Sequence, residues 1–524
     1  MTASDSQADI FAFLGDPATH GGAEVKRVDT HAAAVFLAGP RVYKVKRAVR
    51  YPFLDFSTLE KRKAACDAEL VVNRPYAPQL YRRVVPITRE RDGALALNGA
   101  GTPVEWAVEM TRFDESATLD RLAERGAIDL ARADALARVV AAAHARALAP
   151  ATQAWPASLA DYISQNDAEL RQHPDLFAPA QVEALTQASR AALQRLEPLL
   201  CARSRAGLVR RGHGDLHLGN IVLIDGRPVI FDAIEFDENI ATGDLLYDLA
   251  FLLMDLIDRG LDAAANVVLN RYLAETRRHD DLDGLAALPL FLSLRAAIRA
   301  KVTAAKRDMT PKRDLTAKRE LAASSGDAIA AAARGYFALA RRVIAPPAPA
   351  LVAIGGLSGT GKSALAHALA PFVAPMPGAV VLRSDVERKR MFGVGETERL
   401  PPPAYGPQET ERVYAALAAK AGRVTAAGHS AIVDAVFATE REREQIAAAA
   451  QSTGTAFRGL FLTADLAVRV ARVEARTHDA SDATADIVRA QDSYALGALD
   501  WTTIKAAGTP DETLAAARAA LAQA

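Results

Sequence analysis

The chain contains very little cysteine: only Cys66 and Cys201 occur among its 524 residues, and they form no CxxC pair. Two isolated cysteines argue against a disulfide framework of the kind that small secreted proteins use, and their spacing does not suit a metal site. This scarcity predicts a protein of a reducing compartment, the cytoplasm.

An excess of charge of either sign is also absent. Lys and Arg together number 63, as do Asp and Glu, so the formal net charge is zero. This balance argues against a protein that gains its affinity for nucleic acid or a membrane surface from bulk positive charge. A local basic groove remains compatible with it.

Long hydrophobic runs are missing as well. The most apolar stretch, LLYDLAFLLMDLI at 245–257, is too short to span a bilayer and is interrupted by two aspartates. The first residues, MTASDSQADIF, lack the basic start and apolar core of a signal peptide. We therefore expect a cytoplasmic protein without membrane contact.

The length of the chain predicts two or three domains, because 524 residues exceed one ordinary hydrophobic core. The clearest boundary is APPAPA at 345–350, since proline cannot continue a helix and restricts the residue before it. The sequence predicts a first domain at 1–342, an extended linker at 343–350 and a second domain at 351–524.

The first domain begins with strand patterns and continues with helical ones. AAVFLAG and RVYKVKR flank a Gly-Pro turn as in a hairpin, and EWAVEMTRF is a further strand candidate. Apolar residues then recur at helical spacing over 119–149, 158–202 and 286–342, with a break near the Thr-Pro at 310–311. A small sheet lobe followed by a larger helical lobe is expected.

The stretch HGDLHLGN at 213–220 is followed by an apolar strand that ends at Asp232. This order suits phosphoryl transfer: Asp215 can accept or orient the proton of an attacking hydroxyl, while the oxygens of Asn220 and Asp232 can hold Mg²⁺ against the phosphates of ATP. A plain polar turn is the alternative, but it leaves the acid after the strand unexplained.

Together HGDLHLGN and IFDAIEF resemble the aminoglycoside phosphotransferase family, relatives of the eukaryotic protein kinases, whose pattern is H-G-D-x-x-x-x-N followed by an apolar-Asp motif. The resemblance implies a bilobal protein-kinase-like fold of the α+β type. It also implies a catalytic base at Asp215 and metal ligands at Asn220 and Asp232. Asp248, in DLLYDLAFLL, would brace the catalytic loop.

Other parts of the first domain follow this family more loosely. In RVYKVKR, Lys44 or Lys46 would hold the nucleotide phosphates, and we favour Lys44. Glu69 would be its ion-pair partner, with Glu60 as the alternative; exposed charges would be the simplest explanation for each. HGGAEVKRVDTH contains one Gly-Gly pair only, so the family's glycine-rich cover over the phosphates is weak here.

The predicted helix at 295–307, RAAIRAKVTAAKR, carries Arg295, Arg299, Lys301 and Lys306 along its length. A basic face that is solvated, or that is paired with nearby aspartates, explains them most simply. An anionic substrate of the first domain is the other hypothesis.

GLSGTGKS at 356–363 fits G-x-x-x-x-G-K-[ST] and stands between a predicted strand and a predicted helix, the context that a P-loop (Walker A) requires. Its glycines let backbone N–H groups surround a phosphate, and the helix N-terminus adds its dipole. Lys362 would reach the β- and γ-phosphates, and Ser363 would be a Mg²⁺ ligand. The predicted nucleotide-binding residues are Gly356, Ser358, Gly359, Thr360, Gly361, Lys362 and Ser363.

Two aspartates end the next predicted strands. Asp385 follows AVVLRS and could act as the base for a bound hydroxyl, while Asp434 ends HSAIVD and resembles the Walker B acid that supports Mg²⁺. Caps at the ends of strands are the alternative for both. This domain is expected to have the α/β fold of P-loop nucleotide-binding proteins, with a parallel sheet flanked by helices.

The segment 468–491 carries Arg469, Arg472 and Arg476 at near-helical spacing and resembles the mobile lid of small P-loop kinases such as the gluconate, shikimate and adenylate kinases. The resemblance implies that Arg472 and Arg476 act as catalytic residues that close over the transferring phosphoryl group and exclude water. An exposed arginine-rich helix is the alternative.

The tandem arrangement resembles bacterial proteins that fuse an aminoglycoside-phosphotransferase-like domain to a P-loop kinase domain. It predicts a bifunctional enzyme that uses ATP and Mg²⁺ to phosphorylate hydroxyl groups of small molecules. Two alternatives stay open: a P-loop kinase regulated by a ligand-sensing first domain, and a polynucleotide-kinase-like enzyme. The balanced charge makes a nucleic-acid partner the least favoured, and neither the acceptors nor the oligomeric state can be read from the sequence.

Overall fold

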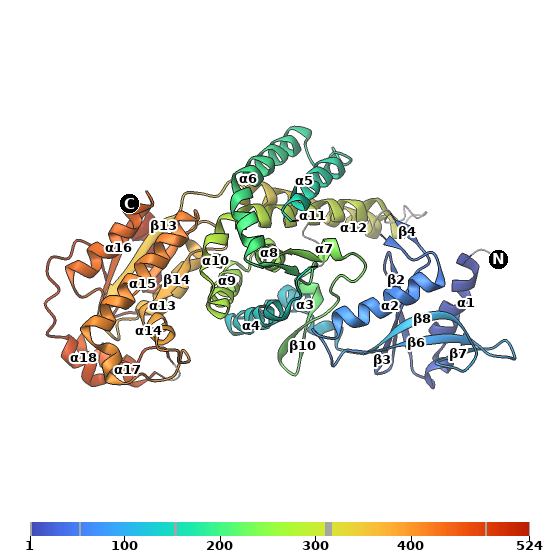
Figure 1. Ribbon diagram of the computed structural model, residues 1–524, viewed down its shortest axis with the longest axis horizontal. Helices are drawn as coiled ribbons and strands as arrows, with labels where there is room; N and C mark the ends of the chain where they lie inside the picture. The colour runs from blue at the N-terminus through green and yellow to red at the C-terminus, as the bar shows by residue number, and fades with distance from the viewer. Residues whose placement is uncertain (1–2, 52–53, 151–154, 310–316, 477–478, 523–524) are drawn as a thin grey trace. The chain divides into compact units, whose positions relative to one another are not determined.

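The computed structural model describes residues 3–522, apart from 52–53, 151–154, 310–316 and 477–478. The chain forms two compact units (Figure 1). The first unit contains 1–155 and 203–255, and the second contains 156–202 and 256–524. Within the described ranges, every helix is too short or too polar to cross a lipid bilayer.

An antiparallel sheet opens the first unit, with the strand order β1-β2-β3-β8-β6-β7. Its strands are β1 (Val25–Asp29), β2 (Ala33–Ala38), β3 (Arg41–Lys46), β6 (Tyr81–Arg89), β7 (Leu95–Leu97) and β8 (Thr102–Thr111). The predicted hairpin is confirmed, since β2 and β3 pair around the Gly39-Pro40 turn. A short ribbon of β4 (Arg50–Tyr51) and β5 (Leu54–Asp55) follows the sheet's third strand.

Two helices cover this sheet, α1 (Ala3–Gly15) and α2 (Leu59–Asn73). Leu14 of α1 packs into a core with Phe36 and Val45, whereas Cys66 of α2 packs with Val108 in a separate cluster. Helix α2 begins at Thr58, whose hydroxyl accepts the N–H of the third helical residue. This capped start fixes the register with which α2 presents its buried face to the sheet.

The remainder of the first unit holds the HGDLHLGN stretch between short strands and helices. These elements are α3 (Leu119–Glu124), α4 (Leu130–Arg146), β9 (Val209–Arg211), β10 (Ile221–Ile224), β11 (Arg227–Ile230), α7 (Glu238–Ala241), β12 (Thr242–Asp244) and α8 (Leu245–Asp258). Strands β10 and β11 form one antiparallel ribbon, and β9 pairs with β12. The apolar run at 245–257 forms α8, nearly all of it buried in the protein, which accounts for its hydrophobicity.

Long helices make up the earlier part of the second unit. They are α5 (Ala157–Leu170), α6 (Pro179–Arg205), α9 (Asp262–Thr276), α10 (His279–Gly284), α11 (Leu288–Met309) and α12 (Ala317–Val343). Basic residues of α11 are satisfied locally: Lys301 pairs with Glu169 at 2.8 Å and Arg307 with Asp175 at 2.6 Å. This favours local pairing over an anionic substrate for these two side chains. The predicted helix break at 310–311 lies outside the described residues.

The proline-rich segment 344–349 has neither helix nor strand, and the chain then enters a parallel sheet. Val343 and Ala350, the two ends of the predicted linker, belong to α12 and β13. The strand order is β14-β15-β13-β16-β17. The strands are β13 (Ala350–Gly356), β14 (Val380–Arg383), β15 (Ala431–Asp434), β16 (Ala456–Thr463) and β17 (Thr502–Lys505).

Seven helices accompany this sheet in the described part of the chain: α13 (Lys362–Leu369), α14 (Ser384–Met391), α15 (Pro407–Ala426), α16 (Glu440–Ser452), α17 (Leu466–Glu474), α18 (Ala485–Gln491) and α19 (Pro510–Ala522). Strand β13 is central, and its Val352 and Ile354 are fully buried, as expected where both faces of a parallel sheet are covered. The carboxyl ends of β13, β14 and β15 lie at one edge, where α/β proteins bind ligands. The predicted α/β fold is confirmed.

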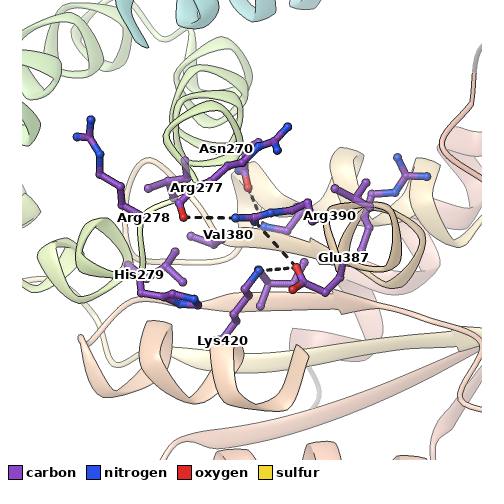
Figure 2. A pocket seen from close by; sticks show the side chains of 15 residues that line it. Asn270, Arg277, Arg278, His279, Val380, Glu387, Arg390 and Lys420 are labelled. Atoms are coloured by element: carbon purple, nitrogen blue, oxygen red, sulfur yellow. Dashed lines mark hydrogen bonds and ion pairs between the residues drawn. The ribbon is translucent and has the colours of Figure 1, made fainter. Parts of the chain in front are cut away.

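Helix α9 covers the free edge of β14, the outermost strand (Figure 2). Asn270 accepts the N–H of Val381 at 2.7 Å and donates to the carbonyl of Ala379 at 3.1 Å. Close by, Arg390 of α14 donates to the carbonyl of Arg277 at 3.4 Å. A side chain on α9 thus takes the place of a neighbouring strand, which protects an edge that would otherwise be open to pairing.

Candidate active sites

The first candidate site is built on the loop after β9. Asp248 of α8 accepts the backbone N–H groups of His213 and Gly214, each at 2.9 Å, as predicted for a residue that braces this loop. The His213 ring lies 2.9 Å from the Phe231 carbonyl, and burial lowers its pKa, so the imidazole is neutral at physiological pH. These contacts make His213 a structural residue.

Asp215 and Asn220 lie side by side in this loop. The amide nitrogen of Asn220 donates to the backbone carbonyl of Asp215 at 2.9 Å and to its carboxylate at 3.0 Å. His217 lies 3.4 Å from the same carboxylate. Because the Asn220 side chain donates through nitrogen to Asp215, its amide oxygen is turned elsewhere and is a suitable ligand for a hard cation.

Asp232 follows β11 with an unusual backbone conformation, since its φ of 62° lies in the left-handed region. Its N–H donates to the Tyr81 hydroxyl at 3.1 Å, and Asn73 of α2 holds the next residue, Ala233, by accepting its N–H at 2.6 Å and donating to its carbonyl at 3.1 Å. Strain that is held by such contacts is typical of functional positions. The half-exposed carboxylate of Asp232 lies 2.7 Å from Lys44.

Both candidate lysines contact the predicted partner, Glu69, which is completely buried. Lys44 lies 2.8 Å from one carboxylate oxygen of Glu69, and Lys46 lies 2.6 Å from the other. Lys44 also pairs with Asp232, whereas Lys46 pairs with Glu235. The two lysines therefore differ in their second contact.

The alternative partner Glu60 is not used, because it lies exposed in the first turn of α2. The pair of Lys46 and Glu235 was missed in the sequence: IFDAIEF was noted only for its aspartate. The signal in the sequence was that Lys44 and Lys46 lie on the same face of one strand, so that two buried ammonium groups need more than one acidic partner.

The charges in this cluster stabilise one another. Burial alone would raise the pKa of the Glu69 carboxyl, but the ammonium groups of Lys44 and Lys46 outweigh it and lower that pKa. Burial would likewise lower the pKa of Lys44, yet Asp232 and Glu69 hold it well above its usual value. The shifts of Glu69, Lys44 and Lys46 all favour the charged form, so these three groups stabilise one another as ions.

A cavity of about 610 Å³ borders these charged residues. Val35, Leu37 and Met110 contribute apolar walls, and Lys44, Asp215 and Asp232 contribute charged groups. Its volume and mostly apolar lining suit a ligand of nucleotide size. One wall comes from Thr30, His31 and Ala32 in the turn between β1 and β2.

That turn contains no glycine, and the Gly-Gly pair of HGGAEVKRVDTH precedes β1 instead. The sequence predicts a weak glycine-rich cover over the phosphates from Gly21 and Gly22. These two glycines do not lie in the turn between β1 and β2, which borders the cavity. A glycine-free turn lines the cavity there.

The second candidate site lies after the central strand β13, where the P-loop leads into α13. Gly359 and Gly361 have φ values of 86° and 95°, which other residues rarely adopt. A β-carbon on Gly359 would lie 2.5 Å from the carbonyl oxygen of Arg469, so a side chain cannot fit. Lys362 donates to the Leu357 carbonyl at 3.2 Å, and burial lowers its pKa.

Ser363 and Asp434 meet at this edge of the sheet. The Ser363 hydroxyl donates to the Asp434 carboxylate at 2.5 Å, and Arg383 donates to the same hydroxyl at 3.1 Å. Arg383 also lies 3.4 Å from Asp434. The Ser363 and Asp434 oxygens thus already bind one cation, the guanidinium group of Arg383. A hydroxyl and a carboxylate oxygen are also suitable ligands for Mg²⁺.

Across the described residues, no three His, Cys, Asp or Glu side chains are grouped so that they could hold a metal ion by themselves. Protein sites commonly bind Mg²⁺ through one or two carboxylates together with water and phosphate oxygens.

Asp385 lies in the first turn of α14, two residues after Arg383, at which β14 ends. Burial, and after it the nearby Asp434 carboxylate, raise the pKa of Asp385 above its usual value, while Arg383 and Lys362 oppose the shift. A carboxylate with a raised pKa is a stronger base than an ordinary aspartate.

Two arginines of α17, Arg469 and Arg472, contact the P-loop, whereas Arg476 follows this helix. Arg469 is almost fully buried and donates to the Ser358 carbonyl at 3.0 Å, so it is structural. Arg472 donates to the carbonyls of Thr360 at 3.5 Å and Gly508 at 3.2 Å. Arg476 lies 3.6 Å from Asp479.

Two polar residues of this region were missed in the sequence. Asp479 pairs with Arg383 at 3.1 Å, and Gln491 accepts the Ser358 N–H at 2.7 Å. Both belong to the predicted lid segment, in which only arginines were singled out. Their partners lie about a hundred residues away in the chain, so spacing carried no signal for them.

Comparisons with known proteins agree with this geometry. Residues 64–288 match the phosphotransferase enzyme family, and residues 351–495 match an AAA domain family. The uncharacterized protein Rv2004c of Mycobacterium tuberculosis is 30% identical over 483 residues, which are 91% of this chain and 90% of that relative.

Solved structures with similarity to parts of the chain include two kinases. A choline/ethanolamine kinase family protein from Mesorhizobium loti is 14% identical with a TM-score of 0.34, and the match covers 64% of this chain and 99% of that one. A gluconokinase from Sinorhizobium meliloti is 19% identical with a TM-score of 0.26, over 33% of this chain and 93% of that one.

Proposed function

Since the chain belongs to the same family as this mycobacterial protein and joins a phosphotransferase-family domain to a P-loop kinase-like domain, we propose that it is a bifunctional ATP-dependent phosphotransferase. Each domain would transfer the γ-phosphate of ATP to a hydroxyl of a small molecule. The observation that supports the proposal is that Lys44 and Asp215 line one cavity in the first unit, while in the second Lys362 lies close enough to Asp385 to oppose the rise of its pKa.

In the first site, Lys44 would hold the nucleotide phosphates while Glu69 keeps its ammonium group in place. Asp215, beside the cavity, would receive the proton of the acceptor hydroxyl. Asn220 and Asp232 would hold Mg²⁺, which when bound neutralises phosphate charge. Asn220 also orients the Asp215 carboxylate through its amide N–H.

In the second site, the P-loop amides and Lys362 would surround the β- and γ-phosphates. Ser363, supported by Asp434, would hold the metal ion, and Arg383 must then turn from these oxygens. Asp385 would take the proton of the acceptor, for which its raised pKa is favourable. Arg472 and Arg476 would face the transferring group and limit the access of water.

Two substitutions in the full-length chain test the two-site proposal. We expect Asp215→Asn and Lys362→Ala each to abolish the phosphorylation of a different set of acceptors when a metabolite mixture is screened with γ-labelled ATP. Asp225→Asn, at an exposed turn, and Lys505→Ala, on an exposed strand, are matched controls that should leave both sets unchanged. If either active-site change removes all phosphorylation, there is only one independent site.

A regulatory first domain is the second candidate function, and the glycine-free turn between β1 and β2 favours it. Such a domain would bind ATP or another ligand without turnover. The Lys362→Ala chain distinguishes the two: phosphoryl transfer by this variant excludes a purely regulatory first domain, whereas complete inactivity with ATP bound supports it.

A further inference from the structure

The first unit contains another cavity, of about 210 Å³, that shares no lining residue with the cavity beside Asp215. It lies where the C-terminal parts of α2 and α4 meet the last residue of β9. The residues that line it are Val71, Val72, Pro75, Tyr76, Ala143, Arg146, Ala147, Leu148, Arg211 and Gly212. None of them has a role in the proposed phosphoryl transfer.

One side of this cavity is aliphatic and open to water. Val71 is 73% exposed and Leu148 is 71% exposed, and Val72 and Pro75 continue the apolar lining. Single exposed aliphatic side chains are common on protein surfaces, but here two of them border the same hollow. A ligand with an apolar body would cover them.

The charged groups of the cavity are all cationic. Arg146 and Arg211 line it, and no acidic side chain does. The Nε atom of Arg211 is buried and has no hydrogen-bond partner among the residues that the structure describes. Buried donors are nearly always satisfied, so this nitrogen marks a place where an acceptor is missing.

We propose that this cavity is an effector site for a small anion with an aliphatic tail. The carboxylate of the ligand would accept from the Arg211 and Arg146 guanidinium groups, which are suited to planar two-point recognition. The tail would lie on Val71 and Leu148. The volume is below the roughly 300 Å³ at which sites for drug-sized ligands begin, so the tail must be short.

The floor of the cavity connects it to the nucleotide site. The Tyr76 ring lies edge-on to the His213 ring at 5.6 Å between centroids, and His213 begins the HGDLHLGN loop. One turn before Tyr76, Asn73 holds Ala233 beside Asp232, and Glu69 lies on the same helix. A ligand against Tyr76 therefore contacts the end of the helix that positions both Glu69 and Asp232.

Because α2 connects this cavity to Glu69 and Asp232, a ligand bound in the cavity can act as an effector of the first nucleotide site. Binding that orders the end of α2 should tighten the binding of Mg²⁺ and ATP to the first site, and linkage requires the nucleotide to tighten the effector by the same factor. The inference goes beyond the proposed function, because it requires nucleotide binding but no phosphoryl transfer.

Octanoate is a suitable probe, with 1-octanol as its uncharged counterpart. Titration calorimetry on the full-length chain should show one octanoate bound per chain and markedly weaker binding of octanol. Arg211→Gln and Arg146→Gln should each weaken octanoate by about tenfold, the loss of roughly one charge-assisted hydrogen bond. Leu148→Ser should weaken it as well, and Arg91→Gln, at an exposed turn, is the matched control without effect.

The coupling is measured in the Lys362→Ala background, which removes the second nucleotide site. Saturating octanoate should increase the affinity for Mg²⁺ and ATP by about fivefold or more, the lower end of the usual range of such couplings. Thermal unfolding of each variant verifies that it folds. If Arg211→Gln does not fold, Arg146→Gln still tests the proposal, because Arg146 is exposed and its substitution should not disturb the fold. Equal binding of octanoate to both arginine variants, equal binding of octanol, or an unchanged nucleotide affinity would overturn the proposal.

Discussion

The buried carboxylate of Glu69 explains why two lysines are present on β3. Each ammonium group contacts one of its oxygens, and each then needs a further acid, Asp232 for Lys44 and Glu235 for Lys46. At the residue scale, both lysines line the cavity, but Lys44 pairs with the metal-site candidate Asp232, whereas Lys46 is almost fully buried and pairs with Glu235.

This difference predicts separate effects for the two lysines. In the Lys362→Ala background, Lys44→Met should abolish ATP binding to the first site. Lys46→Met should lower the free energy of unfolding by about 3 kcal/mol, because it leaves Glu235 buried without its partner. Calorimetry and urea unfolding measure the two effects, and Lys61→Met, at an exposed pair, is the control. Loss of ATP binding only in Lys46→Met would reverse the assignment.

The raised pKa of Asp385 predicts a gain in stability when this residue loses its charge. The pKa of Asp385 is higher in the folded chain than in the unfolded chain, so the folded chain binds more protons. The free energy of unfolding therefore falls as the pH rises above about 3.9, the pKa of an aspartate in the unfolded chain. Asp385→Asn should therefore unfold at a higher temperature than the natural chain at pH 7, and the difference should shrink toward pH 4. Asp500→Asn, at an exposed position, is the control and should show no such difference. An Asp385→Asn chain that is less stable at pH 7 would contradict the raised pKa of Asp385.

At the scale of elements, the P-loop depends on contact with α17. Gly359→Ala would place a β-carbon 2.5 Å from the Arg469 carbonyl oxygen, so the loop must move. Gly428 has a similar positive φ of 74° but open space around it. Both alanine variants should lose about 1–2 kcal/mol from backbone strain, but only Gly359→Ala should lose ATP binding at the second site.

Urea unfolding, and calorimetry in the Lys44→Met background that removes ATP binding at the first site, separate these two effects. Gly428→Ala is the matched control for the strain alone. Retained ATP binding in Gly359→Ala would show that the loop tolerates the displacement and that its contact with α17 is not essential.

At the scale of the molecule, the second unit unites a helical segment with the parallel sheet across the proline-rich linker. Asn270 of α9 satisfies both an N–H and a C=O at the edge of β14. A fragment consisting of 351–524 alone would expose this edge, and exposed edge strands promote association between chains.

We therefore expect the 351–524 fragment to unfold at a lower temperature than the full chain and to self-associate, as measured by thermal unfolding and light scattering. In the full chain, Asn270→Ala should reproduce part of the destabilisation, by about 1–3 kcal/mol, because the Val381 N–H loses its acceptor while Asn266 still donates to the Ala379 carbonyl. Asn239→Ala, at an exposed position, is its control. A fragment that remains monomeric and fully stable would show that α9 is dispensable.

Much of the fold and the core of each site could be predicted because the signals are local. The P-loop needs only a strand, a glycine turn and a helix in succession, and HGDLHLGN with its following strand places Asp215, Asn220 and Asp232 within one short segment. Backbone geometry over such distances follows from the residues themselves.

Tertiary structure alone decided which distant side chains meet. Lys46 with Glu235, Arg383 with Ser363 and Asp479, and Asn270 with the edge of β14 join segments that lie far apart in the chain. Their contacts depend on how helices pack against sheets, which no spacing along the chain encodes. The sequence by itself thus determined two motifs typical of phosphate binding and the fold classes that contain them. Packing decided which buried charges are paired, and it left the Nε donor of Arg211 without an acceptor among the described residues.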